Sequence, residues 1–370
     1  MFSLTELEIG KVLGIGGFGV VCEITGITLS DTSATESDNE AITKIMGNIE
    51  AEEDHYDIST ARELTSRRCI RNGDARYAVK RLKKDLDDFQ TARGRIDLAI
   101  EVRYLHALSH PNIVKMRGVF KTDDPFDPDF FFVMDRLYGT LEDRFVEWRA
   151  TMKKNKRGLL RNMLARKTGK ADSSKDLLID RLVVAYDIAA AFRYMHDHKL
   201  VYRDMKPENM GFDVRGNVKI FDFGLAKAPN PELRNKYGLY HLTGQTGSIP
   251  YMAPEVAMTE PYNEKCDVYS LGILLWEIVS LELAFVALVK SPHDYLKQVV
   301  IGQARPPIGR KWPLLTEQAM KSAWKQSPME RPSMKKMCVM LRADLDDMTT
   351  EESVRSRTKH MIDISNKSSC

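Results

Sequence analysis

The feature that most constrains the fold is a run of three glycines in the stretch VLGIGGFGVVCEI, residues 12–24. Gly14, Gly16 and Gly19 follow the pattern G-x-G-x-x-G, which binds phosphate groups in two unrelated arrangements. In a dinucleotide-binding fold the glycines lead into a helix, with an acidic residue about twenty positions further on. Here they lead into VVCEI, which is β-branched and predicts a strand. The run alone is a weak signal, so its surroundings decide between the two arrangements.

The composition is that of an ordinary soluble globular protein large enough for two lobes. Of its 370 residues, 43% are hydrophobic and 29% are charged. The net charge of +3 gives no reason to expect nucleic acid or an anionic membrane as a partner. The five cysteines are scattered and nowhere spaced as a metal site, which favours reduced thiols inside the cell. We expect a cytoplasmic protein, with the nucleus left open.

Neither a signal peptide nor a membrane helix is expected. The first residues, MFSLTELEIG, are acidic and lack an apolar core. Residues 268–289 nearly reach the length of a membrane-spanning helix, but Glu277 and Glu282 lie inside this segment. We interpret it as the buried centre of a large domain.

Several segments predict regular secondary structure. RYAVKRL at 76–82 has strand character, and DFFFVMDRL at 129–137 is dense enough in apolar residues to be a buried strand. Residues 90–108 show helical spacing that ends at HPN, and the chain from Leu177 onward is mostly helical.

Two charged insertions and a polar tail interrupt or follow this pattern. Residues 31–57 carry nine acids and one base, which predicts a solvated, largely disordered insertion within about 27–73. Residues 151–170, within a basic insertion at about 150–176, carry eight bases and no acid. We interpret them as a solvated loop or exposed helix, with contact to nucleic acid, acidic lipid or a docking partner as the alternative. The tail at 346–370 is polar and predicts mobility.

Four further motifs follow the glycine run in a fixed order. They are YAVK at 77–80, VYRDMKPEN at 201–209, DFG at 222–224 and APE at 253–255. From about residue 7 to 345 the chain therefore resembles the eukaryotic protein kinases. The resemblance implies an α+β, bilobal fold. Its N-lobe, at about 7–134, would be a small, mainly antiparallel β structure with one main helix, and its C-lobe, at about 138–345, would be larger and mainly helical.

The resemblance also implies that ATP and Mg²⁺ are the cofactors and that proteins are the substrates. Phosphoryl transfer requires positioning of two oxygens and neutralisation of phosphate charge, which suits lysine, carboxylate and amide side chains. The implied catalytic residues are Asp204, Lys206 and Lys80, and the implied metal ligands are Asn209 and Asp222. The implied nucleotide-binding residues are Gly14, Gly16, Gly19, Val21, Ala78, Lys80, Glu101, Met134, Asp135, Leu137, Asn209 and Asp222.

Several residues resemble those that set specificity and regulation. Lys206 and Ser248 match the pattern of serine/threonine kinases, and Glu208 matches a position that in some kinases contacts an arginine upstream of the target. YRD resembles the cyclic-AMP-dependent group, whereas CDVYSLGILLWEIVS and AWKQSPMERPS resemble the tyrosine-kinase-like group, so the subgroup stays open. Arg203 beside Asp204 usually accompanies control by activation-loop phosphorylation, for which Thr243 and Thr246 are the candidates. A permanently ordered loop is the alternative.

One position departs from the family pattern. Residue 211, which the family makes bulky and apolar under the adenine, is glycine here, so apolar contact is lost unless Met210, Phe212 or Met134 fills the space.

Two rival functions also stay open. The chain could be a pseudokinase-like scaffold that binds nucleotide without turnover, or a kinase fold that phosphorylates a small molecule. Lys80, Asp204 and Asp222 argue against the scaffold, and the complete GSIPYMAPE segment argues against the small-molecule kinase.

Overall fold

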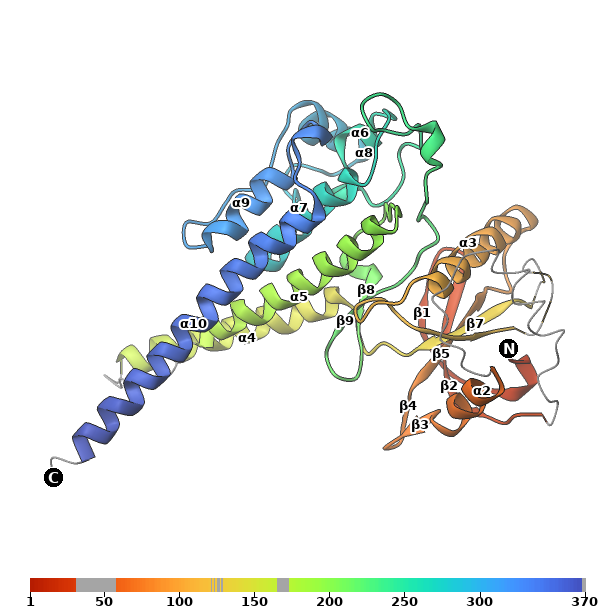
Figure 1. The fold of residues 1–370 in the computed structure, drawn as a ribbon, viewed down its shortest axis with the longest axis horizontal. Coiled ribbons are helices and arrows are strands. Elements are labelled where there is room, and N and C mark those ends of the chain that lie inside the picture. Colours follow the sequence, from red (N-terminus) through yellow and green to blue (C-terminus); the bar gives the residue numbers. More distant parts are fainter. Residues whose placement is uncertain are drawn as a thin grey trace. The chain divides into compact units, whose positions relative to one another are not determined.

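The computed structural model contains a unit built on an antiparallel sheet and a unit built from helices (Figure 1). It describes all residues except 31–57, 121, 123, 125–126, 128, 165–172 and 368–370. The first unit comprises Met1–Tyr138 with Gly211–Ala226, and the second comprises Gly139–Met210 with Lys227–Cys370. The expected α+β composition, with one β-rich and one mainly helical unit, is therefore present.

A five-stranded sheet forms the centre of the first unit. Its order is β1 (Leu7–Ile15), β2 (Gly19–Ile27), β5 (Tyr77–Leu82), β7 (Phe131–Asp135) and β6 (Met116–Val119), with every neighbouring pair antiparallel. Alternate residues of the central strands pack into one core, because successive side chains of a strand point to opposite faces. This core includes Ile24, Tyr77, Val79, Phe131 and Val133. The strands predicted from RYAVKRL and DFFFVMDRL are thus confirmed.

Smaller elements complete this unit. They are α2 (Ile58–Arg67), β3 (Ile70–Arg71), β4 (Asp74–Ala75), α3 (Asp88–Ala107), β8 (Met210–Phe212) and β9 (Val218–Ile220). The helix predicted over 90–108 is α3. Its N-terminus is capped by two reciprocal hydrogen bonds. The Asp87 side chain accepts one from the backbone amide of Gln90, and the Gln90 side chain accepts one from the backbone amide of Asp87.

The helical unit is organised around α7 (Lys265–Ser280). All residues from Cys266 to Val279 are buried, and α7 packs on α5 (Ser173–Asp197) and α9 (Leu314–Ala323). The other helices are α4 (Leu141–Leu164), α6 (Pro254–Ala257), α8 (Pro292–Asp294) and α10 (Met334–Lys367). The apolar stretch at 268–289 thus contains the buried central helix. Among the described residues, no helix combines the length and apolar character that crossing a bilayer requires.

The structure corrects several expected boundaries. The first unit begins before residue 7, since Phe2 is buried and its amide bonds the carbonyl of Val119. The acidic insertion is partly ordered, because α2 and β3 lie within 27–73, although residues 31–57 lie outside the described part. Residues 211–226, expected in the C-lobe, group with the sheet. The basic segment is helical up to Leu164, and residues 346–367 continue α10 instead of forming a separate tail.

Candidate active site

A half-buried lysine and two carboxylates form the charged centre of the first unit. Lys80 lies on β5, opposite Val21 of β2, and its Nζ is 2.5 Å from Glu101 Oε2 on α3. The same Nζ is 3.3 Å from Asp222 Oδ1. Burial raises the pKa of Glu101 to about 7, and the Lys80 ammonium opposes this shift. Burial alone would lower the pKa of Lys80, but Glu101 and Asp222 raise it above its usual value, so this lysine stays charged.

The glycine run forms the turn between β1 and β2, so the expected strand–loop–strand unit is confirmed. The Gly16 amide bonds the Gly19 carbonyl at 2.9 Å, and Lys83 Nζ donates to the carbonyl of Gly17 at 3.0 Å. A Cβ added at Gly14 would meet no atom within 4 Å. Packing therefore does not require glycine at position 14. Its value is an unobstructed backbone, which a phosphate could approach closely.

Strand pairing brings the other expected nucleotide-binding residues of this unit together. Ala78 of β5 lies opposite Met134 of β7, and both are buried. Asp135 ends β7, and its carboxylate accepts two hydrogen bonds from Arg117, at 2.6 and 2.9 Å. The Tyr138 amide then bonds the carbonyl of Phe212 on β8. The segment 135–138 is thus held at both ends.

Leu137 occupies the space beside Gly211. A Cβ added at Gly211 would lie 2.6 Å from Leu137 Cδ1 and 3.0 Å from Leu137 Cβ. The expected replacements were Met210, Phe212 or Met134, and the structure assigns this space to Leu137 instead. A leucine contributed by the segment after β7 therefore compensates for the missing side chain on β8.

In the helical unit, Asp204 is the focus of a hydrogen-bond network. Lys206 Nζ lies 2.8 Å from Asp204 Oδ2, and Ser248 Oγ lies 3.0 Å from Asp204 Oδ1. The side-chain amide of Asn209 donates one hydrogen bond to the backbone carbonyl of Asp204 and one to its Oδ2, at 3.0 and 2.8 Å. The Asp204 side chain is only 9% exposed. Such a fixed carboxylate can orient a hydroxyl group and accept its proton.

A second buried aspartate holds the loop that carries Asp204. Asp267 of α7 accepts the amides of Tyr202 and Arg203, both at 2.9 Å. His196 Nε2 lies 2.9 Å from the same carboxylate. Arg203 adopts a left-handed conformation with φ of 71°, which is costly for a side chain of this size. The bonds to Asp267 offset that cost, so Asp267 anchors the loop that carries Asp204.

Arg331 and Glu255 of the APE motif also pair in the helical unit. The two side chains form a bidentate ion pair at 2.6 and 2.7 Å, and both are almost completely buried. The pair joins the APE motif to the segment that precedes α10.

Sequence reasoning missed one acidic residue of the first unit. Asp97 lies one helical turn before Glu101, and a Cβ at Gly224 of the DFG motif would be 3.5 Å from Asp97 Cβ. Burial and the neighbouring Asp222 raise the pKa of Asp97, while Arg93 and Lys80 oppose the shift. The i, i+4 spacing to Glu101 was the signal that could have identified it.

A model of the protein kinase domain matches residues 65–340. The chain belongs to the protein kinase family. A probable serine/threonine-protein kinase of Dictyostelium discoideum is 30% identical to this kinase over 258 residues, which cover 69% of the chain and 24% of that protein. The serine/threonine-protein kinase STY17 of Arabidopsis thaliana is 33% identical over 180 residues, which cover 48% of the chain and 30% of that protein. Mitogen-activated protein kinase kinase kinase 7 of Drosophila melanogaster is 27% identical over 295 residues, which cover 78% of the chain and 38% of that protein. This kinase thus spans well under half of each relative's length.

Proposed function

We propose that this chain transfers the γ-phosphate of ATP to serine and threonine hydroxyls of proteins. The observation that carries the proposal is the arrangement around Asp204, whose carboxylate is fixed by Lys206, Asn209 and Ser248. Lys206 and Ser248 match the pattern of serine/threonine kinases. Two of the relatives named above are serine/threonine-protein kinases, and the third is a mitogen-activated protein kinase kinase kinase. Asp204 orients the acceptor hydroxyl and takes its proton.

Lys80 neutralises the phosphates of the nucleotide, and Glu101 holds the ammonium in position. The backbone at Gly14, Gly16 and Gly19 covers those phosphates. Val21, Ala78, Met134, Asp135 and Leu137 complete the nucleotide site in the first unit.

Asn209 and Asp222 carry hard oxygen donors of the kind that Mg²⁺ prefers. Asn209 points its amide nitrogen at Asp204, which directs its amide oxygen away from that carboxylate. The Asp222 side chain is 43% exposed, so a cation can reach it. Both side chains therefore fit Mg²⁺, which when bound would neutralise phosphate charge.

We also propose that Thr243 is the activation-loop residue that becomes phosphorylated. Thr243 is exposed, whereas the Thr246 hydroxyl donates to the carbonyls of Thr243 and Gly244, both at 3.1 Å. The Tyr262 hydroxyl donates to the Thr243 carbonyl at 2.7 Å and accepts from Arg203 at 3.1 Å. A phosphate on Thr243 would lie close to the Arg203 guanidinium and stabilise this part of the loop.

The test is transfer of radiolabelled phosphate from ATP by the purified protein, with and without Mg²⁺. The acceptors are the protein itself, a basic protein mixture and a panel of metabolites. We expect Mg²⁺-dependent phosphoserine or phosphothreonine, lost in Asp222→Asn and retained in the exposed control Asp180→Asn. Mapping the labelled chain then checks Thr243. Nucleotide binding without transfer would favour the pseudokinase scaffold, and labelled metabolites would favour a small-molecule kinase.

A further inference from the structure

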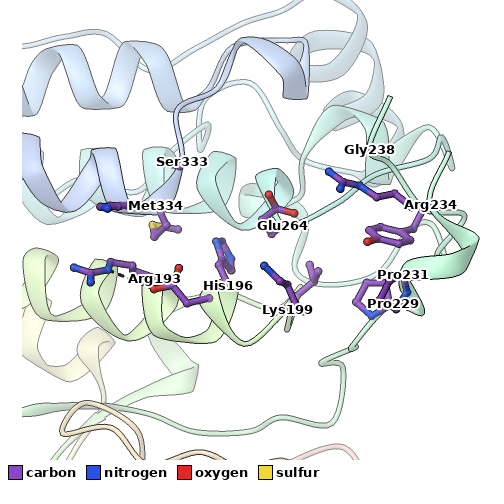
Figure 2. A pocket seen from close by; sticks show the side chains of 14 residues that line it. Arg193, His196, Lys199, Pro229, Pro231, Arg234, Gly238, Glu264, Ser333 and Met334 are labelled. Atoms are coloured by element: carbon purple, nitrogen blue, oxygen red, sulfur yellow. Dashed lines mark ion pairs between the residues drawn. The ribbon is translucent and has the colours of Figure 1, made fainter. Parts of the chain in front are cut away.

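A cavity of about 430 Å³ lies in the helical unit, and none of the residues assigned to catalysis lines it (Figure 2). Four parts of the chain line it: the end of α5 with the loop that follows, the segment 229–240, the residue before α7, and the start of α10. A volume of this size is within the range of roughly 300–1,000 Å³ typical of ligand pockets. The proposed phosphoryl transfer leaves this cavity without a function.

Basic side chains predominate in the lining. The four bases are Arg193, Lys199, Arg234 and Lys335, and the two acids are Asp197 and Glu264, which gives a net charge of +2. Arg193 and Asp197 form an ion pair at 3.6 Å on the same helix, as the dashed line in Figure 2 shows. The excess charge therefore comes from the other three bases, set against Glu264. A phosphate ester, with a charge of about −1.5 to −2 at pH 7, matches this excess better than one carboxylate does.

Arg234 is presented by a folded turn. The Asn235 side chain accepts the amides of Tyr237 and Leu239, at 2.9 and 3.0 Å. Gly238 adopts φ of +80°, and a Cβ on it would lie 2.7 Å from Arg234 Nη2, so the guanidinium rests where only glycine leaves space. Asn263 donates to the Gly238 carbonyl at 3.1 Å and fixes the turn from outside.

Apolar side chains adjoin this turn on the surface. Leu233 precedes Arg234 and is 71% exposed, and Tyr237 precedes Gly238 and is 61% exposed. A free phosphate ion would not contact them, but a peptide residue next to a phosphorylated side chain would.

From the charge and the apolar rim, we propose that this cavity binds a phosphorylated peptide segment. The phosphoserine or phosphothreonine group enters the cavity, where the positive charges of Lys199, Arg234 and Lys335 attract it. A neighbouring apolar residue of the peptide packs on Leu233 and Tyr237. The inference does not depend on the proposed catalytic activity, because no catalytic residue takes part.

The test measures fluorescence anisotropy of a labelled peptide, Gly-Leu-Ser-Leu-Gly, carrying phosphate on its serine, against the full chain. The comparison peptides lack the phosphate, carry glutamate in place of serine, or carry alanine in place of both leucines. We expect saturable binding of the phosphopeptide. The affinity should fall about tenfold or more in Arg234→Gln and in Lys335→Ala, because each variant removes a charge-assisted hydrogen bond. Lys336→Ala is the matched control, since Lys336 is exposed on the same helix but does not line the cavity.

Three results would overturn the proposal: no saturable binding, equal affinity for the phosphorylated and unphosphorylated peptides, or equal losses in Lys335→Ala and Lys336→Ala. Competition by inorganic phosphate as strong as that of the phosphopeptide would also overturn it, because the ligand would then be the free ion. Thermal unfolding of each variant identifies any that fail to fold. Lys335→Ala, at an exposed position, keeps the test valid if Arg234→Gln is one of them.

Discussion

Gly211 and Leu137 are far apart in the sequence, but their side-chain positions overlap in the folded protein. Residue 211 is buried within β8, and the side chain of Leu137 lies where any larger residue at that position would extend. The two positions must therefore be complementary in size, since tightly packed interiors respond to a change of even one methylene group.

Gly211→Leu should destabilise the protein by about 1–3 kcal/mol, because the added side chain overlaps Leu137. Leu137→Ala should also destabilise it, by opening a cavity. The double variant should be more stable than the sum of the two effects predicts, with a coupling of about 0.5–3 kcal/mol. Denaturant unfolding of all four proteins measures this coupling. Strict additivity would show that the two side chains do not compete for the same space.

At the scale of elements, α3 supports three parts of the nucleotide site with one face. Gly94, Asp97 and Glu101 are spaced by three and four residues, so they lie on the same side of the helix. Gly94 is next to Phe18 at the tip of the glycine loop, Asp97 is next to Gly224, and Glu101 binds Lys80. The helix thus couples the glycine loop, the DFG motif and Lys80.

Gly94→Ala tests this coupling. The new Cβ would lie 2.8 Å from both Leu82 Cδ2 and Phe18 Cβ, so the glycine loop or the helix has to shift. We expect the KM for ATP to rise several-fold and the free energy of unfolding to fall by about 1–3 kcal/mol. Gly17→Ala is the control, because a Cβ there meets nothing within 4 Å. An unchanged KM in Gly94→Ala would argue against the role of α3.

Elements that the sequence predicted well carry strong local patterns. β5 contains Tyr77 and Val79, and β7 begins with Phe131, Phe132 and Val133, which are residue types that favour strands. α3 shows apolar spacing with a capping box at Asp87. The sequence did not predict α2, whose stabilising contacts are remote. Its Arg62 pairs with Glu6, and Ser66 donates to the carbonyl of Ile27 at 2.7 Å. Such tertiary contacts override weak local propensity.

The candidate site was predictable to the extent that its residues fall within motifs. Asp204, Lys206 and Asn209 are close in sequence, and their side chains contact one another. The partnership of Leu137 with Gly211 was not predictable, because it depends on how two distant backbones approach each other. The bond between His196 and Asp267 is similar, joining residues on two different helices.

At the scale of the whole molecule, stability should depend on pH through Glu277. Glu277 lies on the buried central helix α7, and its carboxyl group accepts from the Tyr251 hydroxyl at 2.6 Å and the Ala284 amide at 2.7 Å. Burial raises its pKa from 4.5 to about 7, although these two bonds and Arg149 oppose the shift. The folded state therefore binds a proton more tightly than the unfolded state does.

It follows that the contribution of Glu277 to stability is full below about pH 4.5 and is lost as pH rises through about 7. Glu277→Gln replaces the neutral acid with an uncharged group of the same shape. Compared with this variant, the wild type should lose stability on the order of 3 kcal/mol between pH 5 and pH 8. Urea unfolding of both proteins across this range measures the difference. A difference independent of pH would show that Glu277 is ionised throughout.

The central claim is that Asp204 performs the proton chemistry of phosphate transfer, and Asp204→Asn tests it most directly. The measurement is single-turnover transfer from radiolabelled ATP, together with nucleotide binding by the same preparations. The account predicts a loss of transfer by a factor of about 10² to 10⁴ with nucleotide affinity nearly unchanged. Transfer at the wild-type rate by Asp204→Asn would contradict the account and move the chemistry to another residue.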